Sequence, residues 1–251
     1  MNYNAIFQYN NVEKPFIEIK LYNETEAIYK GLLEINNAAL KNGLPDYNAL
    51  LNAIDKFLTS ANIERQKVLF IINPNDLFKS TTIIPGTNER KTKKLYDIEL
   101  GNKMPNFKEL NSYSFIQSLS DSKIYYEYLI NKNYDEYFNK LGNELGFSNV
   151  TVDNNFGYLY NNVVKEIKSN TFVYFYEEKN ITTMFVVING VVSGYNSFVS
   201  TDGNYRLNIM SIVDKHIHEF EKTSISKVIT NKEVACLAYL NPEVREFEIG
   251  K

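Results

Sequence analysis

The sequence predicts a mixed α/β fold in which two halves repeat one plan. The clearest pattern lies between Thr171 and Ser200, where three runs rich in Phe, Tyr, Val and Ile follow one another. Asn189-Gly190 separates the last two runs and favours a type I′ hairpin turn, because both central residues of that turn adopt positive φ. A weaker β-rich segment opens the chain, and helix and strand patterns follow each opening. Two such openings indicate a duplicated core.

Length, composition and charge restrict the class of protein. The 251 residues are 44% hydrophobic, which suits a folded chain with a sizeable buried core. A net charge of −3 and a pI of about 5.6 give no electrostatic reason to expect DNA or RNA as a partner. The single cysteine, Cys236, excludes an internal disulfide and a cysteine metal cluster, and it favours a reducing compartment.

The sequence shows neither the pattern of a secretion signal at residues 1–16 nor that of a membrane-spanning helix. Residues 1–16 lack a basic segment followed by an apolar run. The longest apolar runs, Lys67–Ile72 and Thr183–Ile188, have the size of strands and fall short of the roughly 18 apolar residues of a membrane helix. We therefore expect a cytosolic protein without direct membrane insertion, which reaches a membrane through a partner.

Alternation and helical periodicity define the elements of the first half. Phe16–Tyr22 alternates apolar and polar residues, and Ala27–Ile35 has the pattern of the next strand. Asp46 has the position of an N-cap before an amphipathic helix of about three turns. The buried strand Lys67–Ile72 follows, so the predicted order at the start of the chain is β, β, α, β.

The middle of the chain carries its own strands and one polar helix. Asp76–Ile84 is predicted as a strand, and Thr87–Leu100 as a helix. Ser112–Leu119 and Lys123–Ile130 alternate and predict a tyrosine-rich hairpin. The polar helix carries a basic cluster, which we interpret as a solvated face, with a contact to acidic lipid headgroups or an acidic partner as the alternative. The cluster consists of Arg90, Lys91, Lys93 and Lys94.

Helices and strands alternate through the rest of the chain. The predicted helices are Tyr134–Leu145, Asn155–Lys168, Tyr205–Glu221 and Lys232–Leu240. The predicted strands, besides the three runs after Thr171, are Asn149–Asp153, Ile225–Thr230 and Val244–Ile249. The second half therefore repeats the β-rich opening and the α/β order of the first.

Two longer stretches carry a resemblance to a known family. They are KVLFIINPNDLFKSTTIIP, which begins at Lys67, and YFNKLGNELGFSNVTVDNNFGYLYNNV, which begins at Tyr137, with the polar helix and the hairpin between them. In this order they resemble the type IV pilus assembly protein PilM and its relatives GspL and FtsA, with Asp153 in the family's Asp position. The resemblance implies an α/β, actin-like fold of the duplicated ribonuclease H-like kind.

The resemblance also implies how the chain divides. Residues 1–170 would form the first actin-like half, including a small inserted subdomain at about residues 73–150, and residues 171–251 would form a second, shortened half. Only the predicted helix Tyr205–Glu221 separates the second meander from Ile225–Thr230. The usual helical subdomain of the second half is therefore expected to be missing or reduced, and the family's Gly-rich adenosine motif has no counterpart.

Phosphate-binding loops are the second departure from the family. Active members place a glycine-containing loop between the first two strands of each half, where backbone amides approach phosphates. We assign these loops to Leu21–Thr25 and Tyr176–Asn180, and neither contains glycine. Glu177 and Glu178 would also repel a phosphate. We expect no bound nucleotide, no cofactor and no enzymatic activity. The alternative is an actin-like ATPase that binds Mg-ATP through atypical loops.

Other catalytic and metal-binding patterns are absent from the sequence. No P-loop, GxSxG, HExxH or GxGxxG motif occurs. His216 and His218 would point to different sides of a helix, which is unsuited to one metal. Cys236 lies among apolar residues, as inert core thiols do. Isolated aspartates are more often helix caps or surface residues than ligands, so we assign no catalytic, cofactor or metal residue. The isolated aspartates are Asp153, Asp202 and Asp214.

By the resemblance, the chain would be a non-enzymatic scaffold at the cytoplasmic face of the inner membrane. In the family, the cytoplasmic tail of a PilN-like bitopic protein lies in a groove between the first core subdomain and the inserted one. Tyr113, Phe115, Tyr126 and Tyr128 are candidate partner-binding residues, because aromatic side chains give a large contact area at low entropic cost. An unrelated α/β interaction protein, a homodimer, and the choice between a pilus and a secretion system stay open.

Overall fold

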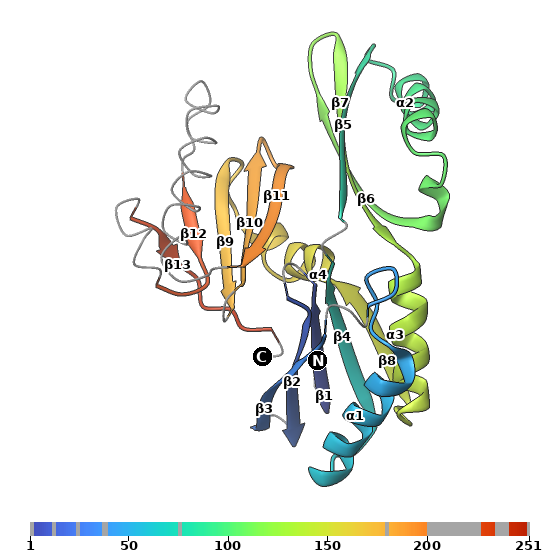
Figure 1. The fold of residues 1–251 in the computed structure, drawn as a ribbon. Coiled ribbons are helices and arrows are strands. Elements are labelled where there is room, and N and C mark those ends of the chain that lie inside the picture. Colours follow the sequence, from blue (N-terminus) through green and yellow to red (C-terminus); the bar gives the residue numbers. More distant parts are fainter. Residues whose placement is uncertain are drawn as a thin grey trace.

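Three β-sheets form the framework of the protein in a computed structural model that describes residues 3–11, 14–23, 26–36, 40–74, 77–178, 181–199, 227–233 and 241–249 (Figure 1). The first sheet has the order β3-β2-β1-β4-β8, the second β11-β10-β9-β12-β13, and the inserted sheet β5-β7-β6. The first sheet contains β1 (Ala5–Asn10), β2 (Phe16–Asn23), β3 (Glu26–Glu34), β4 (Lys67–Asn73) and β8 (Asn149–Asn154). The second contains β9 (Phe172–Glu178), β10 (Ile181–Ile188), β11 (Val191–Val199), β12 (Val228–Thr230) and β13 (Glu243–Val244).

The first and second sheets follow the same plan. In each sheet three consecutive strands pair antiparallel, and two later strands join in parallel on the other side of the first strand. This is the duplicated ribonuclease H-like arrangement of an actin-like fold, so the predicted fold class is confirmed. Asn189 and Gly190 join β10 to β11 with φ values of 52° and 77°, as a type I′ turn requires.

The central strand of the first sheet, β1, was missing from the sequence prediction. It pairs antiparallel with β2 and parallel with β4, and all six of its residues are buried. The first half therefore begins β, β, β, α, β rather than β, β, α, β. This corrects the loop assignment as well, because residues 11–15 connect the first two strands in sequence, and Leu21–Thr25 includes the connection from β2 to β3. Residues 11–15 also contain no glycine.

Helices cover both faces of the first sheet. On one face, α1 (Tyr47–Ser60) and α3 (Asn133–Glu144) bury an apolar core against alternate residues of β1, β2 and β4. Asp46 caps α1 as predicted, since its carboxylate accepts the Ala49 amide at 2.8 Å. On the other face lies α4 (Asn155–Asn162), followed by a 3₁₀ turn at Val164–Glu166. A second core joins α4 to the second sheet, so α4 lies between the two halves (Figure 1).

The inserted sheet projects away from the first sheet and carries its own helix (Figure 1). Tyr96 of the helix stacks on Tyr125 of the sheet with ring centroids 4.4 Å apart. The sheet ends at Asn131, short of the subdomain boundary expected at about residue 150, because α3 and β8 return to the first sheet. The elements are β5 (Phe78–Pro85), α2 (Glu89–Lys103), a 3₁₀ turn at Phe107–Glu109, β6 (Leu110–Ser118) and β7 (Ser122–Asn131).

Several predicted features fall outside the described residues. They are the helices Tyr205–Glu221 and Lys232–Leu240 for most or all of their length, and with them His216, His218, Cys236, Asp202 and Asp214. Within the described ranges, no helix combines the length and apolar character needed to cross a bilayer.

Gly142 lets α3 approach the first sheet closely. A Cβ atom at this position would lie 2.7 Å from Val150 Cγ1 and 3.0 Å from Phe70 Cε2. We expect Gly142→Ala to lower the free energy of unfolding by about 1–3 kcal/mol through overpacking, although alanine favours helix. Gly101→Ala in α2 is the matched control, because the nearest atom lies 3.6 Å away. There the helix propensity of alanine should stabilise by about 0.5–1 kcal/mol. Urea unfolding measures both, and equal signs for the two variants would contradict the packing argument.

Candidate functional site

The cleft between the two halves is open on its β12–β13 side, where a pocket of about 1130 Å³ is lined by residues that include Glu18, Lys30, Glu178 and Glu248, and it is nearly filled where β1 and β9 end. In an actin-like fold, this is where the turns after the first strand of each half approach one another. A cavity of only about 20 Å³ persists between β1, β2 and the strands β9 and β10, which is room for about one water molecule. Its lining is mostly polar and includes Gln8, Asn10, Asn73, Asn155 and Thr183.

A buried ion pair joins the two halves beside this cavity. Lys20 of β2, with 1% of its side chain exposed, donates from Nζ to the Glu178 carboxylate at the end of β9. The Tyr176 hydroxyl donates to the other Glu178 oxygen at 2.6 Å, and Gln8 Nε2 donates to the same atom at 3.1 Å. Burial and the nearby Glu178 raise the pKa of Tyr176, so the hydroxyl keeps its proton.

The C-terminal segment also reaches this cluster. Lys20 Nζ donates to the Ile249 carbonyl at 3.3 Å, and the Ile249 amide donates to the Tyr176 hydroxyl at 3.3 Å. Glu18 and Glu248 lie 3.8 Å and 4.0 Å from the ammonium. A phosphate entering from this side would meet three carboxylates, while the two nearby lysines, Lys20 and Lys30, are already paired with Glu178 and Glu248, which is electrostatically unfavourable.

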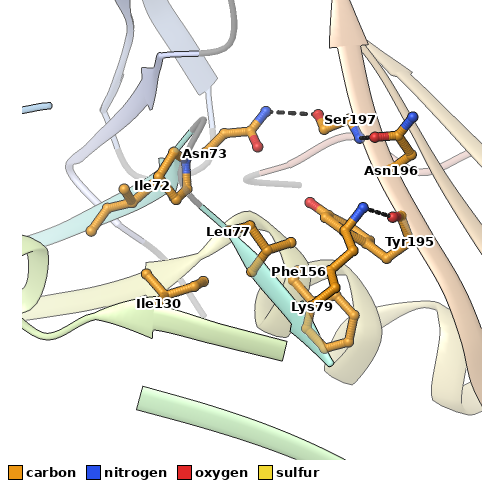
Figure 2. A pocket seen from close by; sticks show the side chains of 10 residues that line it. Ile72, Asn73, Leu77, Lys79, Ile130, Phe156, Tyr195, Asn196 and Ser197 are labelled. Carbon is orange, nitrogen blue, oxygen red and sulfur yellow. Dashed lines mark hydrogen bonds between the residues drawn. The ribbon is translucent and has the colours of Figure 1, made fainter. Parts of the chain in front are cut away.

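A larger pocket lies where the first sheet, the inserted sheet and the second sheet meet (Figure 2). We call it the junction pocket, and its volume is about 230 Å³. The strand β4 ends at its floor, β5 and β7 contribute one wall, and β11 contributes the opposite wall. Its lining consists of Ile72, Asn73, Pro74, Leu77, Lys79, Ile130, Phe156, Tyr195, Asn196 and Ser197.

Polar groups of the junction pocket concentrate on the β11 side (Figure 2). Asn73 Nδ2 donates to the Ser197 hydroxyl at 3.0 Å, and the Ser197 amide donates to Asn196 Oδ1 at 3.1 Å. Lys79 Nζ donates to the Tyr195 carbonyl and lies 5.6 Å from the Tyr195 ring centroid. Although Lys79 as a whole stays exposed, desolvation of its ammonium lowers the pKa. The pocket thus combines apolar walls, amide and hydroxyl groups, and one cation.

The four tyrosine and phenylalanine candidates lie together on the face of the inserted sheet that packs on α4. Tyr128 is 3% exposed, and its ring stacks on Phe156 at a centroid distance of 4.6 Å. Phe115 contacts Tyr160 edge-on at 5.0 Å. Tyr126 is partly buried, and its hydroxyl donates to Gln117 Oε1 at 3.2 Å. These rings attach the inserted sheet to the body of the protein.

Tyr113 and Asp153 meet at the start of α4. The Tyr113 hydroxyl accepts from Asn154 Nδ2 at 3.0 Å and donates to Asp153 Oδ1 at 3.4 Å. Burial raises the pKa of Asp153, while the Asn154 amide and the Tyr113 hydroxyl oppose that shift. No group of three or more His, Cys, Asp or Glu residues suited to a metal occurs in the described part of the chain. Asp153 Oδ1 accepts hydrogen bonds from the Tyr113 hydroxyl and from the Asn154 amide.

Sequence reasoning missed Lys20, Glu178 in its paired role, and Lys79. Glu18 and Lys20 alternate with apolar residues along β2, a pattern typical of a solvent-exposed face. Lys79 follows Phe78 in a strand of mixed polarity and carries no local signal. Each of these side chains gains its role from a partner in the other half, more than a hundred residues away along the chain.

Comparison with known proteins shows the fold. No family model matches the chain, and no curated protein matches it either. A chain of the "PilM-PilN type IV pilus biogenesis complex" is 9% identical with a TM-score of 0.58, and the match covers 95% of this chain and 86% of that one. At this identity the likeness is one of fold. The protein therefore has a PilM-like, actin-like fold, as the sequence resemblance predicted.

Two further solved structures are more distant in shape. The cytoplasmic domain of EpsL, an inner membrane component of the type II secretion system of Vibrio cholerae, is 8% identical with a TM-score of 0.49, over 98% of this chain and 86% of that one. A Bacteroides thetaiotaomicron protein with an actin-like ATPase fold and unknown function is 12% identical with a TM-score of 0.44, over 95% and 86% of the two chains.

Proposed function

We propose that this protein is a non-enzymatic scaffold of a type IV pilus or type II secretion-like assembly. In this role it lies at the cytoplasmic face of the inner membrane and binds the cytoplasmic tail of a PilN-like protein. The fold likeness to a chain of the PilM-PilN complex supports the assignment. The observation that carries it is a contrast between two sites: the junction pocket beside the inserted sheet combines apolar walls with hydrogen-bonding groups, whereas the wider pocket between the halves is lined by six glutamates and two lysines.

The junction pocket has the chemistry of a peptide-binding site. Ile72, Leu77 and Ile130 provide apolar walls, and Asn196 and Ser197 provide hydrogen-bonding groups along a strand. Extended peptides bind such sites by inserting alternate side chains while their backbone is held by polar groups. An interface of this size is below that of stable complexes, so we expect affinity on the order of micromolar.

Binding of a tail peptide tests the scaffold proposal. The probes are synthetic peptides of about ten residues, about 33 Å long when extended, that tile the cytoplasmic tails of bitopic inner-membrane proteins of the same assembly. Fluorescence anisotropy should show one binding segment. Asn196→Trp should abolish binding by filling the pocket, and Asn139→Trp on α3 is the control, because Asn139 is exposed and outside the pocket. No binding by any tail at about 1 mM would contradict the proposal.

The non-enzymatic part of the proposal has its own test. Mg-ATP should give no binding heat at about 1 mM nucleotide. A dissociation constant at this limit corresponds to a binding free energy of about −4 kcal/mol. The physical reason is the Lys20–Glu178 pair, together with the lack of glycine in the sequence that connects the first two strands of each half, residues 11–15 and 179–180. Saturable binding heat, or ATP hydrolysis above background, would favour the alternative of an actin-like ATPase with atypical loops.

A further inference from the structure

The outer edge of β11 faces the junction pocket. β11 is the terminal strand of the second sheet as described, with β10 on its other side. In an antiparallel ladder, a residue directs both its N–H and its C=O toward the partner strand or both away from it. The Tyr195 carbonyl accepts from Lys79, and the Ser197 amide donates to Asn196 Oδ1. Tyr195 and Ser197 are two residues apart, so both direct their backbone groups outward.

Two side chains occupy the backbone groups that another strand would use. Lys79 Nζ takes the place of an incoming N–H at the Tyr195 carbonyl, and Asn196 Oδ1 takes the place of an incoming carbonyl at the Ser197 amide (Figure 2). Both side chains belong to partly exposed or exposed residues and can rotate away. Nearer the start of β11 the buried Tyr128 hydroxyl donates to the Val192 carbonyl, so the part of the edge held by movable side chains is Tyr195–Ser197, and this part can accept an added strand.

Lys79 also selects the charge of an added strand. Its ammonium is partly desolvated and contacts a neutral carbonyl, and none of the ion pairs among the described residues involves it. An ammonium in such a site binds a carboxylate more strongly than a carbonyl, because both partners are charged. The complementary ligand is a peptide with an acidic side chain near the middle of its extended segment.

We infer that the partner's tail binds as an extra strand on β11 over Tyr195–Ser197, with an acidic side chain paired to Lys79. This inference rests on the proposed scaffold function and specifies how the same pocket recognises its ligand. On binding, Lys79 exchanges the Tyr195 carbonyl for the peptide carboxylate, and the peptide backbone takes over the hydrogen bonds of Tyr195 and Ser197.

A charge exchange tests the role of Lys79. The probe is the tail peptide that binds in the anisotropy assay, with each acidic residue replaced in turn by lysine. One such replacement should weaken binding to the unchanged protein about tenfold or more. Lys79→Glu should weaken binding of the original peptide similarly and restore binding of that one lysine peptide. Lys91→Glu is the control, because Lys91 is exposed on α2, outside the pocket.

Backbone N-methylation tests strand addition. A peptide paired with β11 presents every second N–H to the strand, so N-methylation should abolish binding at alternate positions and leave the positions between them unaffected. A tail that binds without this alternation and without charge exchange would overturn the inference and leave the scaffold proposal standing. A tail that binds nowhere would overturn both. Unchanged melting temperatures for the Lys79 and Lys91 variants exclude misfolding as the cause.

Discussion

Lys20→Met is expected to lower the free energy of unfolding by about 3 kcal/mol, because it leaves the Glu178 carboxylate, whose side chain is 16% exposed, without its cation. Lys20 is 1% exposed, and its ammonium is the counter-charge for a carboxylate from the other half of the molecule. Methionine fills a similar volume, so the loss reports the charge rather than a cavity. Glu178 would keep only the hydrogen bonds from Tyr176 and Gln8.

A double-mutant cycle separates the ion pair from other effects. Glu178→Gln keeps the hydrogen-bonding shape and removes the charge, so Lys20→Met combined with Glu178→Gln should recover about 2 kcal/mol relative to the additive expectation. Lys232→Met is the control, since its pair with Glu177 at 3.1 Å has a lysine with 46% of its side chain exposed. Lys232→Met should lower the free energy of unfolding by less than about 1 kcal/mol. Equal losses for Lys20→Met and Lys232→Met in urea unfolding would show that the buried pair does not hold the halves together.

Phe156→Ala is expected to lower the free energy of unfolding by about 3–5 kcal/mol. Phe156 lies in the first turn of α4 and is 1% exposed. Its ring lies 4.6 Å from Tyr128 of the inserted sheet and 4.9 Å from Tyr195 of the second sheet, measured between centroids. One side chain therefore packs against the inserted sheet and the second sheet from a helix that lies on the first, and its removal leaves a cavity where they meet.

Two measurements check the Phe156 prediction. Urea unfolding gives the loss of stability, and limited proteolysis reports whether the inserted sheet loosens before the rest. Phe78→Ala provides the control, because Phe78 is also a phenylalanine next to the pocket's wall but is 37% exposed. Phe78→Ala should lower the free energy of unfolding by about 1 kcal/mol or less. A Phe156→Ala protein with unchanged stability and protease resistance would mean that the three sheets hold together without this contact.

Elements with a regular pattern could be predicted from the sequence. The α1 helix has its cap at Asp46 and a clear apolar stripe, and the β10–β11 hairpin has its Asn-Gly turn. Such signals are local, because hydrophobic periodicity and turn chemistry act within a few residues. Together with the order of elements, they were sufficient for the duplicated actin-like fold.

Elements whose environment is set by distant residues could not be predicted. Strand β1 is buried on both faces, so it shows no alternation, and Gln8 and Asn10 further weaken its apolar character. Lys20 alternates with apolar residues along β2, which is typical of a residue on the solvent-exposed face of a strand. Its partner Glu178 is 158 positions away, and burial of that face becomes visible only when both halves are assembled.

The four aromatic candidates show a related limit of prediction from sequence, which concerns partner-binding residues. Tyr113, Phe115, Tyr126 and Tyr128 were selected because aromatic rings serve interfaces well, and the structure does place them at an interface within the chain. The chemistry of an aromatic side chain does not show whether the residue contacts another sheet of the same protein or a different protein. Whether any of the four also touches a partner stays a prediction, and Tyr128 would need to leave a buried stack to do so.

The place where the inserted sheet joins the body has a consequence for how such proteins diversify. Phe78 near the start of β5 pairs with Leu129 near the end of β7, so the chain leaves the core and returns to it at neighbouring points. The two halves can close around any module with that spacing. Selection can therefore remodel α2 and the outer strands freely, provided that the aromatic face against Phe156 is kept.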